Sequence, residues 1–239
     1  MAAAGAGERL GAGGPKAFVP VAGRPMIEWS LDAFAASESV RSIVVAAPPG
    51  HVGDVARGRR DLGVVPGGAT RAESVANALE AVGTGYVAIH DAARPLLTPE
   101  LVEALVAALD ANPDAGGVIA AAPVTDTIKR ADRTNLQLTP SEEANRRFVV
   151  ERTENRSTLW AAQTPQVFRT EALREALAAA ERPEEATDEA MLVEASGGTV
   201  LIHPVEGQNL QVTTPLDLRV AELLLAERAA AGAQSRSST

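Results

Sequence analysis

Near the N-terminus lies the stretch Ala2-Ala3-Ala4-Gly5-Ala6-Gly7-Glu8-Arg9-Leu10-Gly11, which continues through Gly13-Gly14-Pro15-Lys16. Five glycines within residues 5–14 leave this backbone with few Cβ atoms, so its N–H groups can approach a polyanion closely. Arg9 and Lys16 place two positive charges in the same loop. The combination indicates a cradle for a triphosphate, while a flexible Gly/Ala-rich terminus is the alternative that composition alone favours.

Two common phosphate-binding loops do not fit this stretch. A dinucleotide-binding loop of the G-x-G-x-x-G type needs glycine at position 10, which is Leu10, and a helix that Gly13-Gly14-Pro15 would prevent. A Walker A loop needs Ser or Thr after its lysine, whereas Ala17 follows Lys16. The spacing instead resembles the nucleotide-sugar pyrophosphorylase pattern, A-A-G-x-G-x-R-[LM] followed by P-K.

Composition is typical of an acidic globular protein. The 239 residues are 46% hydrophobic, enough for a core in one domain, and the formal net charge of −9 argues against nucleic-acid binding. The chain has no cysteine, which excludes disulfides and thiolate chemistry and suits the cytosol. No apolar run approaches the ~20 residues of a membrane span, and no secretory signal is visible. We therefore expect a cytoplasmic protein that binds neither nucleic acid nor membrane.

Short β-branched runs alternate with helical patterns, which is typical of parallel strands joined by crossover helices. The expected strands are residues 42–47, 63–66, 86–90, 118–122 and 199–203. The expected helices are residues 25–36, 71–82, 99–109, 171–180, 188–195 and 215–228. The predicted class is α/β: a single Rossmann-like open sheet, mixed but mostly parallel, flanked by helices, as in nucleotidyltransferases.

Two segments interrupt this alternation. Residues 129–159 are polar apart from an apolar cluster at 148–150, and a structureless loop of this length is improbable in a compact domain. We expect a projecting arm that pairs with a second subunit to form a homodimer, the alternative being a disordered insertion. The small, polar residues 232–239 are expected to be a disordered tail after one domain of residues 1–231.

The strand that should precede the glycine loop is short. An open α/β sheet places this strand at its centre, but only residues 1–4 precede Gly5, against the ~5–6 residues of a normal strand. We expect the strand to continue upstream of Met1, the alternative being a stub.

Two later motifs follow expected strands, at the edge of an open α/β sheet where ligands bind. In Gly67-Gly68-Ala69-Thr70-Arg71-Ala72-Glu73-Ser74-Val75, the glycines can admit a base or ribose and the Ser74 hydroxyl can bond a base. An ordinary strand-to-helix turn is the alternative. In His90-Asp91-Ala92-Ala93-Arg94-Pro95, Asp91 can hold hydroxyls or a hydrated Mg²⁺, and Arg94 can hold a phosphate. A hydrolase triad is excluded because the chain has no G-x-S-x-G nucleophile elbow.

Together these motifs resemble the cytidylyltransferases that make CDP-methylerythritol in the non-mevalonate isoprenoid pathway, the IspD family. The family patterns G-G-x-x-R-x-x-S-V and H-D-A-A-R-P are matched in full. Further matches follow at residues 123–129, Arg156, Leu159-Trp160, residues 163–168 and residues 187–189. The matches are in order and cover positions 2–225, which chance does not readily explain.

The resemblance implies a role for each site residue. Arg9 and Lys16 would be catalytic, stabilising the transition state and the leaving pyrophosphate. CTP would contact Ala3, Ala4, Gly5, Gly7, Gly68, Ser74, Asp91 and Ala92. The sugar phosphate would contact Asp91, Arg94, Thr127, Thr164, Thr187 and Gln211, together with Arg156 from the neighbouring subunit's arm. Mg²⁺ would be bound mainly through the CTP phosphates, with no protein ligand assigned.

The implied reaction joins CTP and 2-C-methyl-D-erythritol 4-phosphate by in-line attack on the α-phosphorus, so catalysis is positioning and charge neutralisation. Three features depart from the family pattern: a longer arm, Ala17 in place of the usual Gln, and Gln211 in place of a lysine. They leave two alternatives open. One is a cytidylyltransferase for another polyol phosphate, such as ribitol 5-phosphate, and the other is a nucleotide-binding homologue with impaired catalysis.

Overall fold

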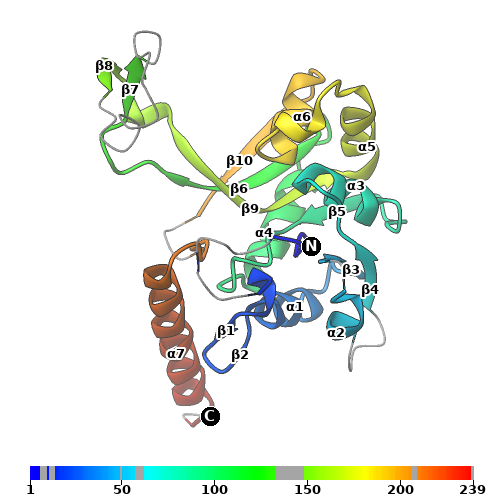
Figure 1. The fold of residues 1–239 in the computed structure, drawn as a ribbon, viewed down its shortest axis with the longest axis vertical. Helices are drawn as coiled ribbons and strands as arrows, with labels where there is room; N and C mark the ends of the chain where they lie inside the picture. The colour runs from blue at the N-terminus through cyan, green and yellow to red at the C-terminus, as the bar shows by residue number, and fades with distance from the viewer. Residues whose placement is uncertain are drawn as a thin grey trace.

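The structure is a computed structural model that describes residues 1–5, 10, 14–48, 50–56, 62–132, 148–205 and 209–237 (Figure 1). The helices are α1 (Met26–Ala35), α2 (Val52–Ala56), α3 (Arg71–Leu79), α4 (Pro99–Asp110), α5 (Thr170–Ala179), α6 (Glu189–Ala195) and α7 (Pro215–Ser237). The strands are β1 (Pro20–Val21), β2 (Arg24–Pro25), β3 (Ile43–Ala47), β4 (Leu62–Pro66), β5 (Tyr86–Ile89), β6 (Gly117–Pro123), β7 (Lys129–Asp132), β8 (Val149–Thr153), β9 (Trp160–Arg169) and β10 (Val200–Pro204). Every predicted helix and strand is present, and all except α7 lie close to their expected bounds.

A mixed sheet forms the centre of the fold. β10, β6, β9 and β5 lie side by side in that order, with β10 parallel to β6 and β9 antiparallel to both of its neighbours. β3 and β4 form a separate parallel pair. Ala2 joins the two groups, because it makes parallel bridges to Ala46 on β3 and to Asp91 just after β5. The predicted α/β class with a mixed sheet is confirmed.

Residues 1–3 form a short central strand. The Ala2 N–H donates to the His90 carbonyl over 2.9 Å, and the Ala2 carbonyl accepts from the Ala92 N–H over 3.0 Å. On the other side, the Ala3 N–H donates to the Ala46 carbonyl over 3.0 Å. This short strand leads directly into the glycine loop, so the loop begins at the middle of the sheet.

Helices cover both faces of the sheet (Figure 1). On one face, α1 and α4 pack against β3 through a cluster that includes Phe34, Val45 and Val102. On the other face, α3, α5 and α6 pack through a cluster that includes Leu79 and Phe168. These two apolar layers fix the strands whose carboxyl ends carry the predicted site residues.

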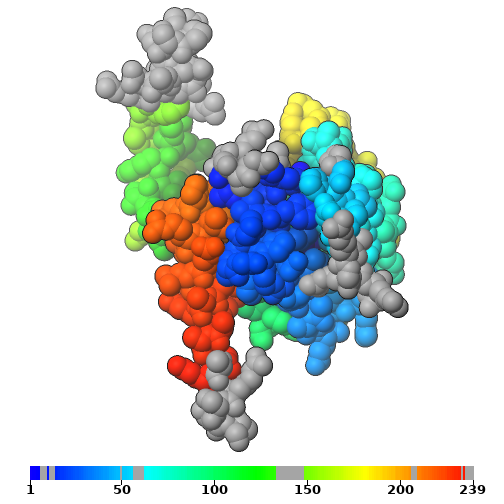
Figure 2. Space-filling model, turned by 60° about the horizontal axis from the view of Figure 1, so that its bottom comes forward, coloured from blue at the N-terminus to red at the C-terminus, as the bar shows by residue number. Residues whose placement is uncertain are grey.

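The C-terminal helix α7 lies against the N-terminal part of the chain (Figure 2). Its Ala221 and Leu225 share a buried cluster with Val21 and Met26. The prediction of a disordered tail at 232–239 is wrong for residues 232–237, because α7 continues to Ser237. Alanines at 229–231 and the absence of proline let the helix propagate. None of the described helices is long and apolar enough to cross a membrane.

Strand β9 was not predicted. It contains Pro165, which has no N–H to donate and therefore argues against a central strand. The ladder accommodates this proline at an irregularity, since the β6–β9 register shifts between Ile119 and Ala121. The antiparallel direction of β9 is what makes the sheet mixed.

The predicted arm contains a hairpin that projects from the body of the molecule (Figure 1). Strands β7 and β8 pair antiparallel, with a register shift between Arg130 and Ala131. Phe148, Val149 and Val150 are 46%, 69% and 56% exposed, respectively. Residues 133–147 of the arm lie outside the described residues. The hairpin gives this segment regular structure near its base, and its pairing with a second subunit stays a prediction.

Candidate active site

Three loops meet around a pocket of about 390 Å³ at the carboxyl ends of the central strands. They are the start of the glycine loop, the turn after β4 and the loop after β5. Nine predicted site residues line this pocket: Ala3, Ala4, Gly5, Lys16, Gly68, Ser74, Asp91, Ala92 and Gln211. The structure thus brings together residues that are more than two hundred positions apart in the sequence.

The two ends of the glycine loop are held close to each other. The Lys16 N–H donates to the Gly5 carbonyl over 3.2 Å, and residues Lys16–Phe18 then form a 3-10 turn. Leu10 is buried in a cluster with Val21 and Val212, which anchors the loop between its ends. The predicted site residues Gly7 and Arg9 lie outside the described residues. The backbone therefore brings Lys16 back to the same pocket that Gly5 lines.

The turn after β4 needs both of its glycines. A Cβ on Gly67 would lie 2.5 Å from the Ala4 Cβ, and one on Gly68 would lie 2.2 Å from the Glu73 Cβ. The Ser74 hydroxyl accepts from the Gly68 N–H over 3.0 Å and donates to the Thr70 carbonyl over 2.9 Å. In this structure the Ser74 side chain therefore holds the turn at the edge of the pocket.

A cluster of charged side chains borders the pocket. The guanidinium of Arg71 donates to Asp91 Oδ1 from Nε over 3.3 Å and from Nη2 over 3.2 Å. Its Nη1 donates to Glu189 Oε1 over 2.6 Å. The Gln211 amide donates to Asp91 Oδ2 over 3.4 Å. Sequence reasoning missed Arg71 and Glu189, although Arg71 stands inside the quoted motif of residues 67–75 and Glu189 ends the match at residues 187–189.

Burial and charge oppose each other in this cluster. Burial lowers the pKa of the Arg71 guanidinium. The negative charges of Glu189 and Asp91 raise this pKa by more, so that its net shift is upward. Burial raises the pKa of Glu189, and Arg71 opposes that rise. Glu189 is 1% exposed, and its Oε2 makes no hydrogen bond within the described part of the chain. Arg71 is thus a cation held beside the pocket from two directions.

Behind Asp91 lies a buried polar platform. The Asp91 N–H donates to Thr164 Oγ1 over 3.0 Å, and this hydroxyl also lies 3.1 Å from His90 Nδ1. Arg94 Nη1 donates to the Asn209 carbonyl over 2.8 Å, and the Asn209 amide donates to the Thr164 carbonyl over 2.7 Å. Two predicted substrate contacts, Arg94 and Thr164, are therefore buried and support the loop that carries Asp91.

The histidine of this platform is neutral. His90 is fully buried, and desolvation lowers its pKa to about 3, although Asp91 opposes the effect. Its Nε2 lies 3.2 Å from Ser30 Oγ. Since the ring is enclosed between Ser30 and Thr164, it has a structural role and takes no part in acid–base chemistry.

Besides the buried Arg94 and Thr164, three predicted substrate contacts do not line the pocket of their own chain. Thr127, Arg156 and Thr187 are exposed. Arg156 lies in the 3-10 turn Arg156–Thr158 at the base of the arm, where its Nη1 donates to the Thr125 carbonyl over 2.5 Å. Thr187 precedes Asp188, which caps α6 by accepting from the Met191 N–H over 3.0 Å.

The described residues contain no group of three or more carboxylate or histidine side chains arranged to hold a metal ion. Among the described residues that line the pocket, Asp91 is the one carboxylate, and both of its oxygens lie within hydrogen-bonding distance of Arg71 or Gln211. The pocket contains one acidic residue, and it therefore resembles an anion-binding site rather than a dedicated metal site.

Comparison with known proteins agrees with this geometry. The model of a family described as 2-C-methyl-D-erythritol 4-phosphate cytidylyltransferase matches residues 1–227. A protein of that name from Frankia casuarinae is 45% identical over 228 residues, which cover 94% of this chain and 79% of the relative. Another, from Azoarcus sp., is 41% identical over 239 residues, covering 95% and 92% of the two chains.

The fold is also similar to solved structures. The crystal structure of a 2-C-methyl-D-erythritol 4-phosphate cytidylyltransferase from Thermus thermophilus matches with a TM-score of 0.69 and 37% identity. The match covers 89% of this chain and 94% of that one. Sequence and structure comparisons therefore agree over almost the whole chain.

Proposed function

Because the chain belongs to the 2-C-methyl-D-erythritol 4-phosphate cytidylyltransferase family, we propose that its reaction takes place in the pocket that Gly5, Gly68 and Asp91 border. The chain is a nucleotidyltransferase. It converts CTP and 2-C-methyl-D-erythritol 4-phosphate into 4-diphosphocytidyl-2-C-methyl-D-erythritol and pyrophosphate, in the non-mevalonate route to isoprenoids.

The proposal that the reaction takes place in this pocket rests on one observation. The glycine loop, the Gly67-Gly68 turn and the Asp91 loop are far apart in the sequence, and all three line one pocket at the carboxyl edge of the sheet. The pocket combines the start of the glycine loop with the cations Lys16 and Arg71. Such a combination suits a nucleotide with three phosphates.

In this pocket the chain's residues would position two anions and neutralise charge. An oxygen of the acceptor phosphate attacks the α-phosphorus of CTP, and the bond from that phosphorus to the pyrophosphate oxygen breaks. Lys16 and Arg9 would stabilise the negative charge that develops on the leaving pyrophosphate. Ser74 and Gly68 would border the nucleotide at the turn after β4.

The acceptor phosphate would bind on the side of Gln211 and Arg94. The Nε of Arg94 is buried and makes no hydrogen bond within the described residues, although it lies 4.0 Å from Asp91 Oδ2. A buried donor without a partner is costly, so a phosphate or hydroxyl oxygen that reached it would be bound favourably. Thr164 would act through Asp91, whose backbone it holds.

Magnesium would be held mainly by the CTP phosphates. The residues present fit this arrangement, since Mg²⁺ keeps several waters and uses few protein carboxylates when it accompanies a nucleotide. Asp91 is the carboxylate placed to accept from such a water. The ion would supply neutralisation of phosphate charge.

The arm would complete the site of a second subunit. A partner surface would bury its exposed apolar residues Val149 and Val150, and Thr127 and Arg156 do not line the pocket of their own chain. A homodimer in which each arm reaches the neighbour's pocket accounts for both facts. The cytoplasmic location expected from the sequence stays a prediction.

A turnover assay tests the placement of the reaction. We expect pyrophosphate release with CTP and 2-C-methyl-D-erythritol 4-phosphate, and at least ~10²-fold lower kcat in Lys16→Ala with normal thermal stability. Ribitol 5-phosphate serves as the comparison acceptor. If Lys16→Ala raised KM for CTP but left kcat near normal, Lys16 would contribute ground-state binding alone.

A further inference from the structure

Glu189 is the one acidic residue that is fully buried among the described parts of the chain. It is the first residue of α6, where Asp188 already caps the helix by accepting from the Met191 N–H. Its Oε1 accepts from Arg71, while its Oε2 makes no hydrogen bond within the described residues. A carboxylate is costly to bury. Because capping is complete without Glu189, its burial needs another explanation.

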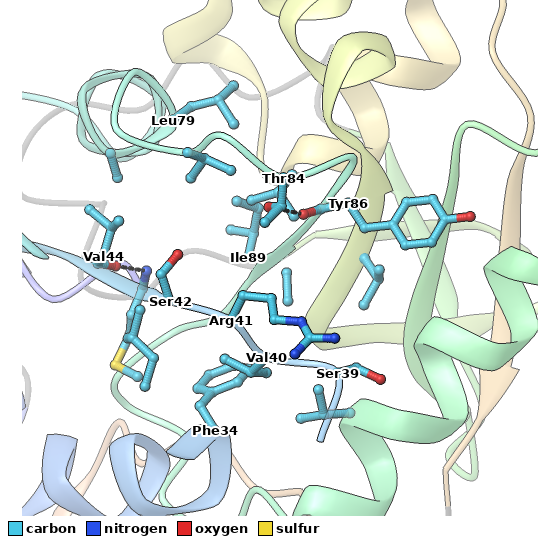
Figure 3. A pocket seen from close by; sticks show the side chains of 18 of the residues that line it. Phe34, Ser39, Val40, Arg41, Ser42, Val44, Leu79, Thr84, Tyr86 and Ile89 are labelled. Carbon is cyan, nitrogen blue, oxygen red and sulfur yellow. Dashed lines mark hydrogen bonds between the residues drawn. The ribbon is translucent and has the colours of Figure 1, made fainter. Parts of the chain in front are cut away.

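The carboxylate of Glu189 lines neither of the two pockets described for this molecule. The second pocket, also of about 390 Å³, lies between β3 and β5, and its lining is mostly apolar, as Phe34 and Leu79 illustrate (Figure 3). Any part that Glu189 takes in the reaction must therefore act through a neighbour. Arg71 is the neighbour that lines the candidate active site.

Arg71 occupies a position where a cation does not stabilise its own helix. It is the first residue of α3, and the positive end of the helix dipole opposes an arginine there. Thr70 and Glu73 already complete this helix end as a capping box. A cation at the start of α3 thus meets a buried carboxylate at the start of α6. Local conflicts of this kind are typical of functional sites.

The position of Arg71 decides how the two oxygens of Asp91 are used. Arg71 donates to Oδ1 twice, from Nε over 3.3 Å and from Nη2 over 3.2 Å. The partners of Oδ2 are more distant, with the Gln211 amide at 3.4 Å and Arg94 Nε at 4.0 Å. Oδ1 is therefore occupied, whereas Oδ2 is available to accept from a hydroxyl group of a ribose or a polyol.

Glu189 in turn determines which edge of the Arg71 guanidinium faces Asp91. A guanidinium is planar, and its N–H groups point in fixed directions. Because Glu189 holds Nη1 over 2.6 Å, the edge that carries Nε and Nη2 is directed at Asp91. Without a negative charge at position 189, the guanidinium would be free to turn. The Asp91 carboxylate would then lose its fixed position.

We propose that Glu189 is a positioning residue for the cytidylyl transfer. Through Arg71 it holds Asp91 Oδ1, so that Oδ2 accepts from a hydroxyl group of the bound substrate. The pair also joins the first turn of α6 to the first turn of α3, across 118 positions of the sequence. This role rests on the proposed placement of the reaction in the pocket that Asp91 lines.

The test removes the charge of Glu189 and keeps its shape. Glu189→Gln should lower kcat at least about tenfold, because a displaced Asp91 no longer orients the substrate. KM for CTP should change less than about threefold, since Lys16 and the glycine loop are intact. Initial rates are measured well below the Tm of each protein. The matched control is Glu194→Gln, at an exposed position of the same helix, which should change kcat less than about twofold.

A double-mutant cycle shows whether Glu189 acts through Arg71. Arg71→Gln should also lower kcat, and adding Glu189→Gln to it should lower kcat by less than about a further twofold. Effects that multiply in the double variant would overturn the proposal. If Glu189→Gln does not fold, Arg71→Lys gives the same comparison, because lysine keeps the charge but lacks the planar fork. A normal kcat in Arg71→Lys would overturn the proposal as well.

Nuclear magnetic resonance reports the position of the guanidinium directly. The Nε–H signal of Arg71, assigned by its loss in Arg71→Gln, should exchange with water at least about tenfold faster in Glu189→Gln than in the wild type. An unchanged signal, or a higher KM for CTP with unchanged kcat, would overturn the proposal. If Lys16→Ala lowers kcat but Glu189→Gln does not, the role of Glu189 fails and the pocket stands. Normal kcat in both variants would overturn the placement of the reaction together with this role.

Discussion

Asp91 is the residue through which the two sides of the candidate active site are connected. One of its carboxylate oxygens accepts from Arg71 of α3, and the other lies near Gln211 and Arg94. Its backbone N–H is fixed by Thr164. Substituting any of these partners would therefore alter the position of Asp91 as well as removing a side chain.

The first prediction concerns Gln211. A hydrogen bond from a cation to a phosphate is worth ~1.5–3 kcal/mol, against ~0.5–1.5 for a neutral donor. Gln211→Lys should therefore raise kcat/KM for 2-C-methyl-D-erythritol 4-phosphate roughly tenfold, with CTP affinity almost unchanged. Steady-state kinetics with each substrate varied in turn measure both quantities.

The matched control for this change is Gln211→Met, which keeps the length of the side chain and removes the donor. It should lower kcat/KM for the sugar phosphate. If Gln211→Lys instead lowered kcat/KM, Gln211 would be adapted to its neighbour Asp91. Improved turnover of ribitol 5-phosphate in the same variant would change the assignment of this subsite.

The second prediction concerns the pH dependence of stability. His90 has a folded-state pKa of about 3 against an ordinary value of 6.5, so the unfolded chain binds its proton more readily. Its neutral form contributes stability that is complete above pH 6.5 and is lost as pH falls towards 3. The free energy of unfolding should fall by about 1.4 kcal/mol per pH unit in this window from His90 alone.

Denaturant titrations of the wild type and of His90→Gln between pH 4 and pH 8 measure this slope. The variant should be less stable at pH 7, because Ser30 and Thr164 lose their partner, but its stability should depend less on pH below 6.5. Parallel pH profiles for the two proteins would contradict a neutral, buried His90.

Sequence reasoning identified the loops of the site better than the contacts within it. Gly68, Asp91 and Gln211 were expected and do line one pocket, because strand ends and glycine turns leave a local signal. The pairing of Arg71 with Glu189 joins residues from α3 and α6, and no local pattern encodes a contact across that distance. The burial of Arg94 likewise depends on the packing of the whole sheet.

At the scale of elements, the turn after β4 sets the distance between α3 and the glycine loop. Gly67 faces the Ala4 Cβ so closely that Gly67→Ala must push the two segments apart. We expect a loss of ~1–3 kcal/mol in the free energy of unfolding and a KM for CTP that rises roughly tenfold. Denaturant titration and initial-rate kinetics measure the two effects.

The matched control is Gly83→Ala, because a Cβ at Gly83 would meet no atom within 4 Å. It should change stability by less than ~0.5 kcal/mol and leave KM unchanged. Equal effects of the two substitutions would show that close approach to Ala4 does not explain the need for glycine at position 67.

The arm yields the fourth prediction. Lys16→Ala and Arg156→Ala proteins should each be weakly active alone, and an equal mixture should recover about a quarter of wild-type activity after subunit exchange. Half of the dimers would be mixed, and each mixed dimer would hold one intact site. Absence of recovery, with exchange demonstrated by mass spectrometry of labelled subunits, would rule out completion of the site by the neighbour.

Helices and parallel strands were predicted well because each carries its own periodic pattern. Strand β9 was not predicted, because Pro165 argues against a central strand. The strand is stabilised by its pairing with β5 and β6, which a local pattern does not reveal. The extent of α7 was underestimated because small and polar residues near a terminus resemble a tail even where helix propensity suffices. Both errors concern elements whose context outweighs their composition.

At the scale of the whole molecule, the sheet consists of two halves that meet at residues 1–3. Ala2 bonds to His90 and Ala92 in one half, while Met1 and Ala3 bond to Ala46 in the other. These residues link the β3–β4 half to the half that contains β5, so local opening of residues 1–3 would loosen the whole sheet.

The pocket proposed to bind CTP spans this junction, so the substrate would also affect the stability of the protein. Gly68 comes from one half and Asp91 from the other, so CTP bound between them would clamp the halves together. A ligand present at 100 times its Kd adds ~2.7 kcal/mol to the free energy of unfolding. The cellular supply of CTP would then govern the lifetime of the enzyme as well as its rate, because proteases would act preferentially on chains that lack nucleotide.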